Sequence, residues 1–246
     1  PYLMRTITLI RHSQASFGAE NYDKLSDLGL AQCDLIGNAF KERHFPTSEE
    51  EASVIWGGQE RHKETMDGVL KFWPYKGPLH KEDRLREFDH MDIIFKGEDG
   101  FKPRAKMGIK LLFSKNKDKT IEKTFLKTLT RWVSGNFEQD YNEPFSKFHK
   151  RSWEGLIDSN EKFKDRKNIF IFTSGGVIAS ILLKVLNIEK ENFIPLVWSL
   201  YNGSLTQLTV RPSLKEELSY EGSFFLSSLN EHHHMIGKGS EFLTNK

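Results

Sequence analysis

The chain has 246 residues, with 36 Lys and Arg against 34 Asp and Glu and a formal net charge of +2. This balance excludes a strongly basic nucleic-acid binder and an acidic disordered chain. A single cysteine, Cys33, excludes a disulfide within the chain and a cysteine-based zinc site. No apolar run reaches the ~18 residues of a membrane span, and the first residues lack the pattern of a signal peptide. These features predict a cytoplasmic protein of enzyme size.

Short apolar segments rich in β-branched residues alternate with amphipathic segments along most of the chain. Expected strands cover residues 6–10, 53–56, 79–85, 169–172, 204–210 and 223–228, and expected helices cover 26–43, 60–72, 119–134, 144–163 and a segment opened by Gly175 and Gly176. Such alternation predicts an α/β fold, a three-layer sandwich in which helices flank a mostly parallel central sheet. We expect one domain over residues 1–246, with a mainly helical insertion at about 90–165 over one end of the sheet.

Polar and charged residues follow the expected strands, and ligands in such sheets bind outside the carboxyl ends of the strands. Arg11 and His12 follow the first expected strand, and Arg61 lies shortly after the second. Glu87 follows the third, and Ser174 and Gly175 follow the fourth. An arginine fork matches the oxygens of a phosphate, and a helix that begins at two glycines offers backbone N–H groups to an anion. The sequence therefore predicts a phosphate site at this end of the sheet.

Five sequence blocks in order make the chain resemble the histidine phosphatase superfamily, which has the phosphoglycerate mutase-like fold. They are Leu-Ile-Arg-His-Ser-Gln-Ala at 9–15, Tyr-Asp-Lys-Leu-Ser-Asp-Leu-Gly at 22–29, Arg-His-Lys-Glu-Thr at 61–65, Leu-Arg-Glu-Phe at 85–88 and Thr-Ser-Gly-Gly-Val-Ile at 173–178. The resemblance is closest to a bacterial branch that begins Arg-His-Gly-Gln-Ala-Ser-Phe-Gly. That branch tends to read Thr-Ser-Gly-Gly in place of the second catalytic histidine motif.

The resemblance implies a role for each matching residue. His12 matches the nucleophile that takes the phosphoryl group as a phosphohistidine, and Arg11 and Arg61 match the arginines that clamp the phosphate. Glu87 matches the acid that protonates the leaving oxygen. These roles agree with simple chemistry, because a neutral imidazole is a competent nucleophile near pH 7 and bound phosphate favours the protonated form of a nearby carboxyl group.

Two positions depart from the family pattern. Ser13 stands where the family usually has glycine, and it could crowd the pocket or donate a hydroxyl group. Ser174 stands where the family usually has a second histidine, although Ser174 and Gly175 are still expected to contact phosphate and Ser174 could cap the following helix. His234, in a run of three histidines unsuited to a metal, could supply the missing imidazole, and Gln14 is a further possible site residue.

The leading prediction is a metal-independent, histidine acid phosphatase-like enzyme that hydrolyses a phosphomonoester through a phosphohistidine on His12. It needs no cofactor and acts on a small phosphorylated substrate, with no nucleic acid and no membrane as partner. The sequence identifies neither the substrate nor the oligomeric state.

Two alternatives stay open. One is phosphoglycerate mutase-type phosphoryl transfer, although Glu87 lacks the Arg-x-Tyr-Gly continuation usual in mutases. The other is a non-catalytic phosphate-ligand or protein-binding module, which Ser13 and Ser174 would favour. The Lys-rich segment 115–127 is expected to be a solvated helix face, and the aromatic residues of 125–153 are expected to form the core of the insertion.

Overall fold

The computed structural model describes residues 4–16, 23–97, 119–211 and 224–245, and the backbone alone for 119–124. Six strands form one sheet in the order β3-β2-β4-β1-β5-β6. Their bounds are β1 Arg5–Arg11, β2 Ala52–Trp56, β3 Leu79–Lys81, β4 Asn168–Thr173, β5 Leu205–Val210 and β6 Phe224–Glu231. The pairings from β3 through β2 and β4 to β1 are parallel, and those of β1 with β5 and of β5 with β6 are antiparallel. The expected mostly parallel sheet is confirmed.

Seven α-helices are described. They are α1 Asp27–Glu42, α2 Glu60–Leu70, α3 His90–Lys96, α5 Lys119–Ser134, α6 Phe145–Lys162, α7 Gly175–Val185 and α8 Phe193–Ser199. The predicted start of α1 is confirmed, because the Ser26 hydroxyl accepts a hydrogen bond from Gly29 N as an N-cap. Two short helices, α3 and α8, were not predicted. One prediction is wrong in part: the extended segment ends at Lys81, and a 3-10 turn covers Asp83–Leu85 because the Glu82 carboxylate accepts from Arg84 N.

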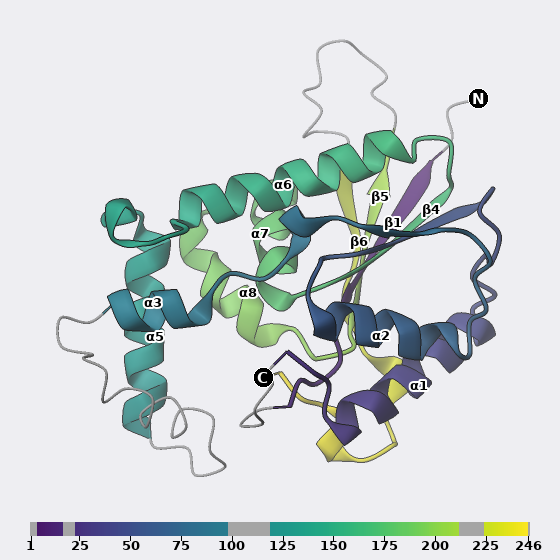
Figure 1. Cartoon of the computed structure of the whole chain (residues 1–246), viewed down its shortest axis with the longest axis horizontal. Coiled ribbons are helices and arrows are strands. Elements are labelled where there is room, and N and C mark those ends of the chain that lie inside the picture. The colour runs from purple at the N-terminus through teal and green to yellow at the C-terminus, as the bar shows by residue number, and fades with distance from the viewer. Residues whose placement is uncertain (1–3, 17–22, 98–118, 212–223, 246) are drawn as a thin grey trace.

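Helices cover both faces of the sheet and complete the three layers, with α1 and α2 on one face and α6 and α7 on the other (Figure 1). The alternation along β4 shows how one strand serves two cores. Ile169 and Ile171 belong to the core under α6 and α7, whereas Phe170 and Phe172 belong to the core under α1 and α2. Successive side chains of a strand point to opposite faces, so a continuous apolar run fits a strand that is covered on both.

The segment between β3 and β4 carries α3, α5 and α6, which lie at one side of the sheet (Figure 1). The aromatic residues expected to form its core differ in burial: Trp132, Phe145, Phe148 and Trp153 are buried, Phe125 is partly buried against the core, and Phe137 is 40% exposed. The prediction is wrong for Phe137, whose ring lies under the Arg131 guanidinium at 3.8 Å. That the chain forms a single domain with a mainly helical insertion stays a prediction.

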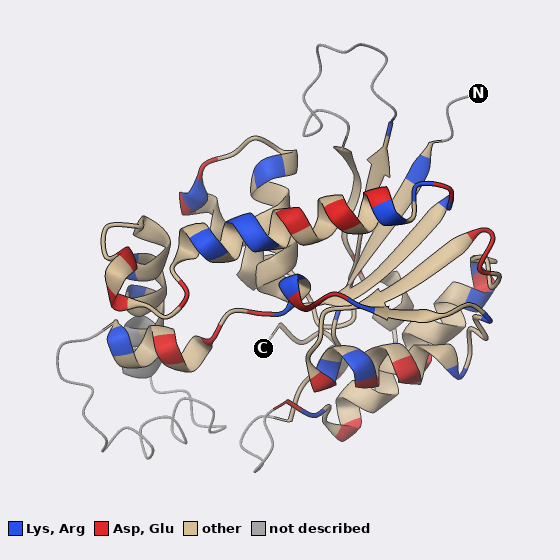
Figure 2. Cartoon of the chain, turned by 45° about the horizontal axis from the view of Figure 1, so that its top comes forward, with Lys and Arg blue, Asp and Glu red and all other residues tan. Residues whose placement is uncertain are grey.

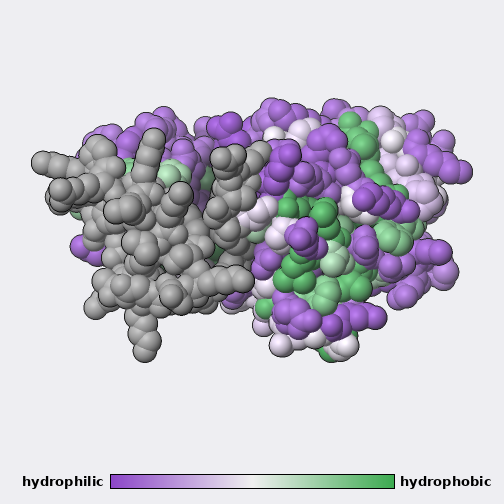
Figure 3. Space-filling view, turned by 60° about the horizontal axis from the view of Figure 1, so that its bottom comes forward, coloured by the Kyte–Doolittle hydropathy of each residue, from purple (hydrophilic) through white to green (hydrophobic). Residues whose placement is uncertain are grey.

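The surface is mixed in charge and in hydropathy. Basic and acidic residues both occur along α6 (Figure 2). From below, hydrophobic residues form a band bordered by hydrophilic ones (Figure 3). Within the described ranges, every helix is too short or too polar to cross a membrane. Residues 115–118 of the Lys-rich segment lie outside the described residues, and the side chains of 119–124 are not described, so the solvated-face prediction is not tested over 115–124.

Candidate active site

The register of the sheet brings three chain segments to one point. Arg11, the last residue of β1, pairs with Thr173, the last residue of β4. The next residue, His12, donates its backbone N–H to Thr173 O at 2.8 Å, and Gly57 N after β2 donates to Phe172 O at 3.0 Å. The carboxyl ends of β1, β2 and β4 therefore meet where the sequence predicts a site.

His12 is held in one tautomer by its own loop. Its Nδ1–H donates to Ser13 O at 2.7 Å, so Nε2 is the nitrogen left with a lone pair. The side chain is 6% exposed. Burial, and after it the positive charge of Arg61, hold the pKa of His12 well below its usual value of 6.5. A neutral imidazole with an available Nε2 is what nucleophilic attack on phosphorus requires.

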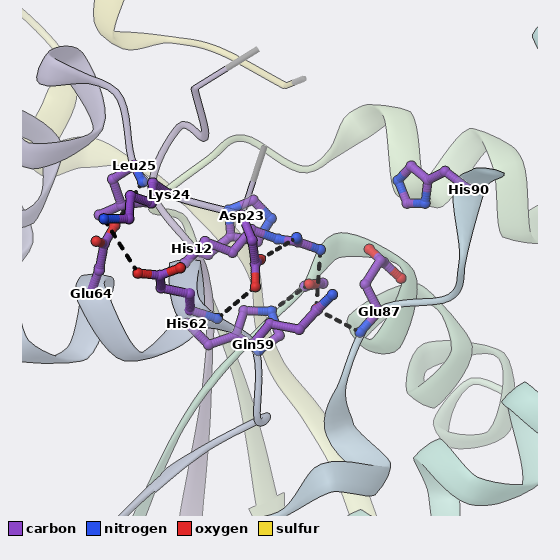
Figure 4. A network of polar contacts seen from close by, with 12 residues as sticks. His12, Asp23, Lys24, Leu25, Gln59, His62, Glu64, Glu87 and His90 are labelled. Carbon is purple, nitrogen blue, oxygen red and sulfur yellow. Dashed lines mark hydrogen bonds and ion pairs between the residues drawn. The ribbon is translucent and has the colours of Figure 1, made fainter. Parts of the chain in front are cut away.

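Arg61, in the first turn of α2, is fixed by two polar neighbours. Nη1 donates to Asp23 Oδ1 at 2.7 Å, and Nη2 donates to Gln59 Oε1 at 3.0 Å. The same Gln59 oxygen accepts from Glu87 N at 2.9 Å, so it ties the arginine to the segment that carries Glu87. His12, Asp23, Gln59 and Glu87 lie close together in Figure 4. The sequence reasoning gave no role to Asp23 or Gln59.

Arg11 lies on the other side of the site. It is 6% exposed, and its Nη1 donates to Leu200 O. Its side chain lies against Gly175, because a Cβ built at that glycine would be 3.2 Å from Arg11 Nε. Gly175 therefore gives Arg11 room beside the start of α7.

Glu87 is bound to the helix start that was expected to be open for phosphate. Gly176 N donates to Glu87 Oε2 at 3.0 Å, and Phe88 N donates to Oε1 at 3.2 Å. A Cβ at Gly176 would lie 2.2 Å from Glu87 Oε1, so this position needs glycine. The expectation of a free N–H at Gly176 is wrong, because the carboxylate occupies it.

Ser13 and Gln14 both make contacts with α1. The Ser13 hydroxyl accepts from Cys33 Sγ at 3.3 Å, and the Gln14 Oε1 accepts from the Ser26 hydroxyl at 2.8 Å. Burial raises the pKa of the Cys33 thiol to about 11, which leaves it protonated and unreactive at neutral pH. Both residues thus anchor the loop after β1 to the neighbouring helix.

His234 lies behind the backbone of the site. Its Nε2 donates to Gly203 O at 3.0 Å, and Gly203 N in turn donates to His12 O at 3.2 Å. Burial lowers the pKa of His234 to about 4. Its predicted role as a substitute imidazole stays a prediction.

Ser174 contacts a histidine that sequence reasoning missed. Its hydroxyl makes no capping hydrogen bond to α7, so the predicted side-chain cap is wrong. Instead, Ser174 Oγ lies 2.5 Å from His62 Nε2. His62 stands within one of the blocks quoted above, directly after Arg61, and a polar residue following a site arginine could have signalled it.

The residues at this site are suited to an anion. No group of three or more His, Cys, Asp or Glu side chains that could hold a metal ion occurs among the described residues. His90 does not join the group, since it stacks on Phe88 with ring centroids 4.4 Å apart and lies on α3 away from His12 (Figure 4).

Comparison with protein families finds one model, "Histidine phosphatase superfamily (branch 1)", which matches residues 113–221. The match includes Ser174 and Gly175 but not His12, Arg61 or Glu87. The family comparison and the fold together support the histidine phosphatase superfamily. The branch with Thr-Ser-Gly-Gly at this place stays a prediction. A search of curated proteins finds no match.

Solved structures with a similar fold include a hydrolase, a mutase and a phosphatase. Mycobacterial hydrolase 2 is 16% identical, with 93% of this chain and 91% of that chain covered and a TM-score of 0.60. A phosphoglycerate mutase from Bacillus anthracis is 17% identical, with 95% and 96% covered and a TM-score of 0.58. A phosphoserine phosphatase from Entamoeba histolytica is 16% identical, with 94% and 100% covered and a TM-score of 0.59. At such low sequence identities, the structural likeness shows a shared fold and nothing further.

Proposed function

We propose that this chain is a metal-independent phosphatase of the histidine phosphatase superfamily, which hydrolyses a phosphomonoester through a phosphohistidine on His12. The observation that carries the proposal is the state of His12: a buried imidazole whose Nδ1–H is bound to Ser13 O and whose pKa is lowered by burial. Two buried arginines, Arg11 and Arg61, lie in the same site. An uncharged nucleophile between fixed cations suits attack on an anionic phosphoryl group.

The reaction proceeds in two displacements. In the first, His12 Nε2 attacks phosphorus in line, the P–N bond forms, and the bond to the ester oxygen breaks as Glu87 protonates that oxygen. In the second, water attacks phosphorus, the P–N bond breaks, and Glu87 accepts the proton from water, so that inorganic phosphate leaves. Arg11 and Arg61 stabilise the charge on the equatorial oxygens in both steps.

The substrate class is a small phosphomonoester. The proteins of similar fold are named for phosphoserine, for glucosyl-3-phosphoglycerate and for alpha-ribazole-5'-phosphate. These molecules share a phosphate ester and little else, so the likeness supports the ester and not one leaving group.

The test is a comparison of the wild type with His12→Ala on p-nitrophenyl phosphate. We expect His12→Ala to abolish turnover, and His80→Ala, on β3 outside the site, to leave it unchanged. Rapid quenching with labelled substrate is expected to trap a phosphoenzyme that is labile in acid and stable in base. Near wild-type hydrolysis by a folded His12→Ala variant would refute the proposal.

A second candidate, phosphoglycerate mutase-type transfer, is favoured by the fold shared with the Bacillus anthracis mutase. Incubation with 3-phosphoglycerate separates the two functions, because a mutase interconverts phosphoglycerates without net release of phosphate. A non-catalytic module would bind inorganic phosphate and form no phosphoenzyme.

The proposed chemistry needs no divalent cation, since arginine side chains supply the positive charge. We expect hydrolysis to be unchanged after dialysis against EDTA. Activity that is lost with EDTA and restored by zinc or magnesium would contradict this prediction.

A further inference from the structure

His62 and Ser174 form a hydrogen-bonded pair inside the candidate active site. Their atoms Nε2 and Oγ lie 2.5 Å apart, although the residues are 112 positions apart in the chain. Both side chains are 0% exposed, and the site residues around them keep 5–8% exposure. A Cβ at Gly57 would lie 2.8 Å from His62 Nδ1, so the ring fits because position 57 is glycine. The pair is thus built into the wall of the site.

The pair lies beside the groups that are proposed to bind phosphate. The His62 and His12 rings have their centroids 5.7 Å apart. Ser174 immediately precedes Gly175, against which Arg11 packs, and Gly176, whose N–H holds Glu87. Ser174 is therefore the chain neighbour of the two glycines that contact Arg11 and Glu87, and its partner His62 lies beside His12.

The proton of the pair can be located from the hydrogen bonds. Burial and the Arg61 charge hold the pKa of His62 well below 6.5, so its ring carries one proton at neutral pH. Nδ1 makes no hydrogen bond of normal geometry among the described residues, although the Gly57 backbone lies close enough to raise the pKa of the ring, whereas Nε2 lies 2.5 Å from Ser174 Oγ. We place the proton on Nε2, because the contact with Ser174 is the one well-formed hydrogen bond of this ring among the described residues.

We propose that His62 and Ser174 form a donor relay: His62 Nε2–H donates to Ser174 Oγ, and the Ser174 hydroxyl donates to an oxygen of the transferring phosphoryl group. The hydroxyl makes no capping bond to α7, so its proton is available for this contact. A phosphoryl group presents acceptor oxygens only, and an oriented donor aimed at it stabilises developing charge. Ser174 is then a catalytic donor, and His62 is a positioning residue that acts through it.

The relay rests on the proposed phosphatase function and is tested by a double-mutant cycle on p-nitrophenyl phosphate hydrolysis. The variants are Ser174→Ala, His62→Phe, the double variant and His62→Gln, with His80→Phe as the matched control. Loss of one such donor lowers kcat by about 10²-fold. We expect His62→Phe and Ser174→Ala each to show this loss in kcat with a smaller change in KM.

His62 acts on the phosphoryl group only through Ser174, so the double variant is expected to be no slower than Ser174→Ala. His62→Gln keeps an N–H donor and should recover part of the loss, whereas His80→Phe should behave as the wild type. Thermal unfolding of each variant verifies folding; if His62→Phe does not fold, the comparison of His62→Gln with Ser174→Ala decides. Losses that multiply in the double variant, or a folded His62→Phe or Ser174→Ala with wild-type kcat, would overturn the relay.

Two further measurements keep the relay distinct from the phosphatase proposal. If the phosphoenzyme is labile in acid both in the wild type and in Ser174→Ala, His12 remains the proposed nucleophile. If instead the label is stable in acid and Ser174→Ala abolishes it, Ser174 is the nucleophile and the relay is overturned. If the wild type does not hydrolyse the substrate, the same cycle is measured on orthovanadate binding by calorimetry. Equal weakening in the single variants and no further weakening in the double supports the relay, and a wild type that binds no vanadate overturns both proposals.

Discussion

At the scale of the residue, the tautomer and the charge of His12 depend on a single backbone carbonyl and on burial. The bond from Nδ1–H to Ser13 O fixes which nitrogen is free, and burial keeps the ring uncharged. Ser13, one of the two residues that depart from the pattern of the family that the chain resembles, accepts a hydrogen bond from Cys33 on its hydroxyl and supplies this carbonyl from its backbone. A side chain at position 13 is therefore compatible with the nucleophile.

The lowered pKa of His12 predicts a titration that differs from that of an ordinary histidine. Because burial disfavours the imidazolium, we expect the ring to stay neutral as the pH falls through 6.5. Carbon–proton NMR spectra of histidine-labelled protein, with His12→Ala for assignment, measure the midpoint. The urea-unfolded chain is the control, in which histidines titrate near about 6.5. A folded-state midpoint near 6.5 would contradict the burial argument.

Arg61 is expected to bind phosphate directly in exchange for part of its contact with Asp23. Removal of a donor aimed at developing charge typically costs about 10²–10³ in rate. We expect a loss of this size in Arg61→Ala, together with weaker competitive inhibition by inorganic phosphate. The control is Arg131→Ala on α5, whose guanidinium pairs with Asp140 outside the site. An unchanged inhibition constant in Arg61→Ala would place this arginine outside the phosphate pocket.

At the scale of the element, helix α6 holds the turn that carries Glu87. Arg151 Nη1 donates to Arg84 O at 2.6 Å and to Arg86 O at 2.7 Å, and its Nε donates to Glu143 Oε1 at 2.5 Å. The guanidinium thereby connects α6 to the turn that carries the proposed acid. A displacement of about 1 Å at a catalytic group can cost about 10² in rate.

We therefore expect Arg151→Met to lower kcat for p-nitrophenyl phosphate by about 10- to 100-fold, because the turn bearing Glu87 loses its anchor. Lys150→Met on the same helix is the matched control, since that lysine is 75% exposed and pairs only with Glu154 at 3.7 Å among the described contacts. Equal activity of the Arg151 and Lys150 variants would show that the turn is held without α6.

The start of α1 packs tightly on the loop after β1. A Cβ built at Gly29 would lie 2.1 Å from Gln14 O, which is less than any normal contact. Gly29→Ala is expected to destabilise the fold by about 1–3 kcal/mol, the usual range for overpacking, and to lower activity by moving the loop that bears His12. Urea unfolding measures the change, with Asn38→Ala on the exposed side of α1 as control. A Gly29→Ala variant as stable as Asn38→Ala would contradict the packing argument.

At the scale of the whole molecule, buried neutral histidines couple folding to pH. The pKa values of His12, His62 and His234 are all lowered, first by burial. Below about pH 6.5 the unfolded chain binds protons that the folded chain does not, so the free energy of unfolding falls as the pH falls. Above that pH these three groups contribute no pH dependence.

Urea unfolding between pH 7.5 and pH 4.5 is expected to show this loss, beginning near pH 6.5. His234→Gln should flatten part of the slope between pH 6.5 and about 4, the pKa of this residue in the folded chain. In the difference between the pH slopes of the wild type and of His234→Gln, the contributions of all titratable groups that the two proteins share cancel. A wild type whose stability does not change between pH 7 and pH 5 would contradict the prediction.

The sequence by itself determined the features that depend on neighbouring residues. Apolar β-branched runs predicted strands, Ser26 predicted the start of α1, and Arg11 and His12 were placed at the end of β1 by covalent adjacency. These features are local, because each follows from the conformational preferences of a few residues and from the two-residue period of a strand.

Only the tertiary structure decided which distant residues meet. Strand β4 lies between β1 and β2, although more than a hundred residues separate it from β2 in the chain. That insertion places Ser174 against His62, and the packing of α6 places Arg151 on the carbonyl groups before Glu87. Propensity and spacing do not encode such pairs, because strand order and helix packing are fixed by burial of apolar side chains over the whole chain. The proposed nucleophile was therefore readable from the sequence, and its buried neighbours were not.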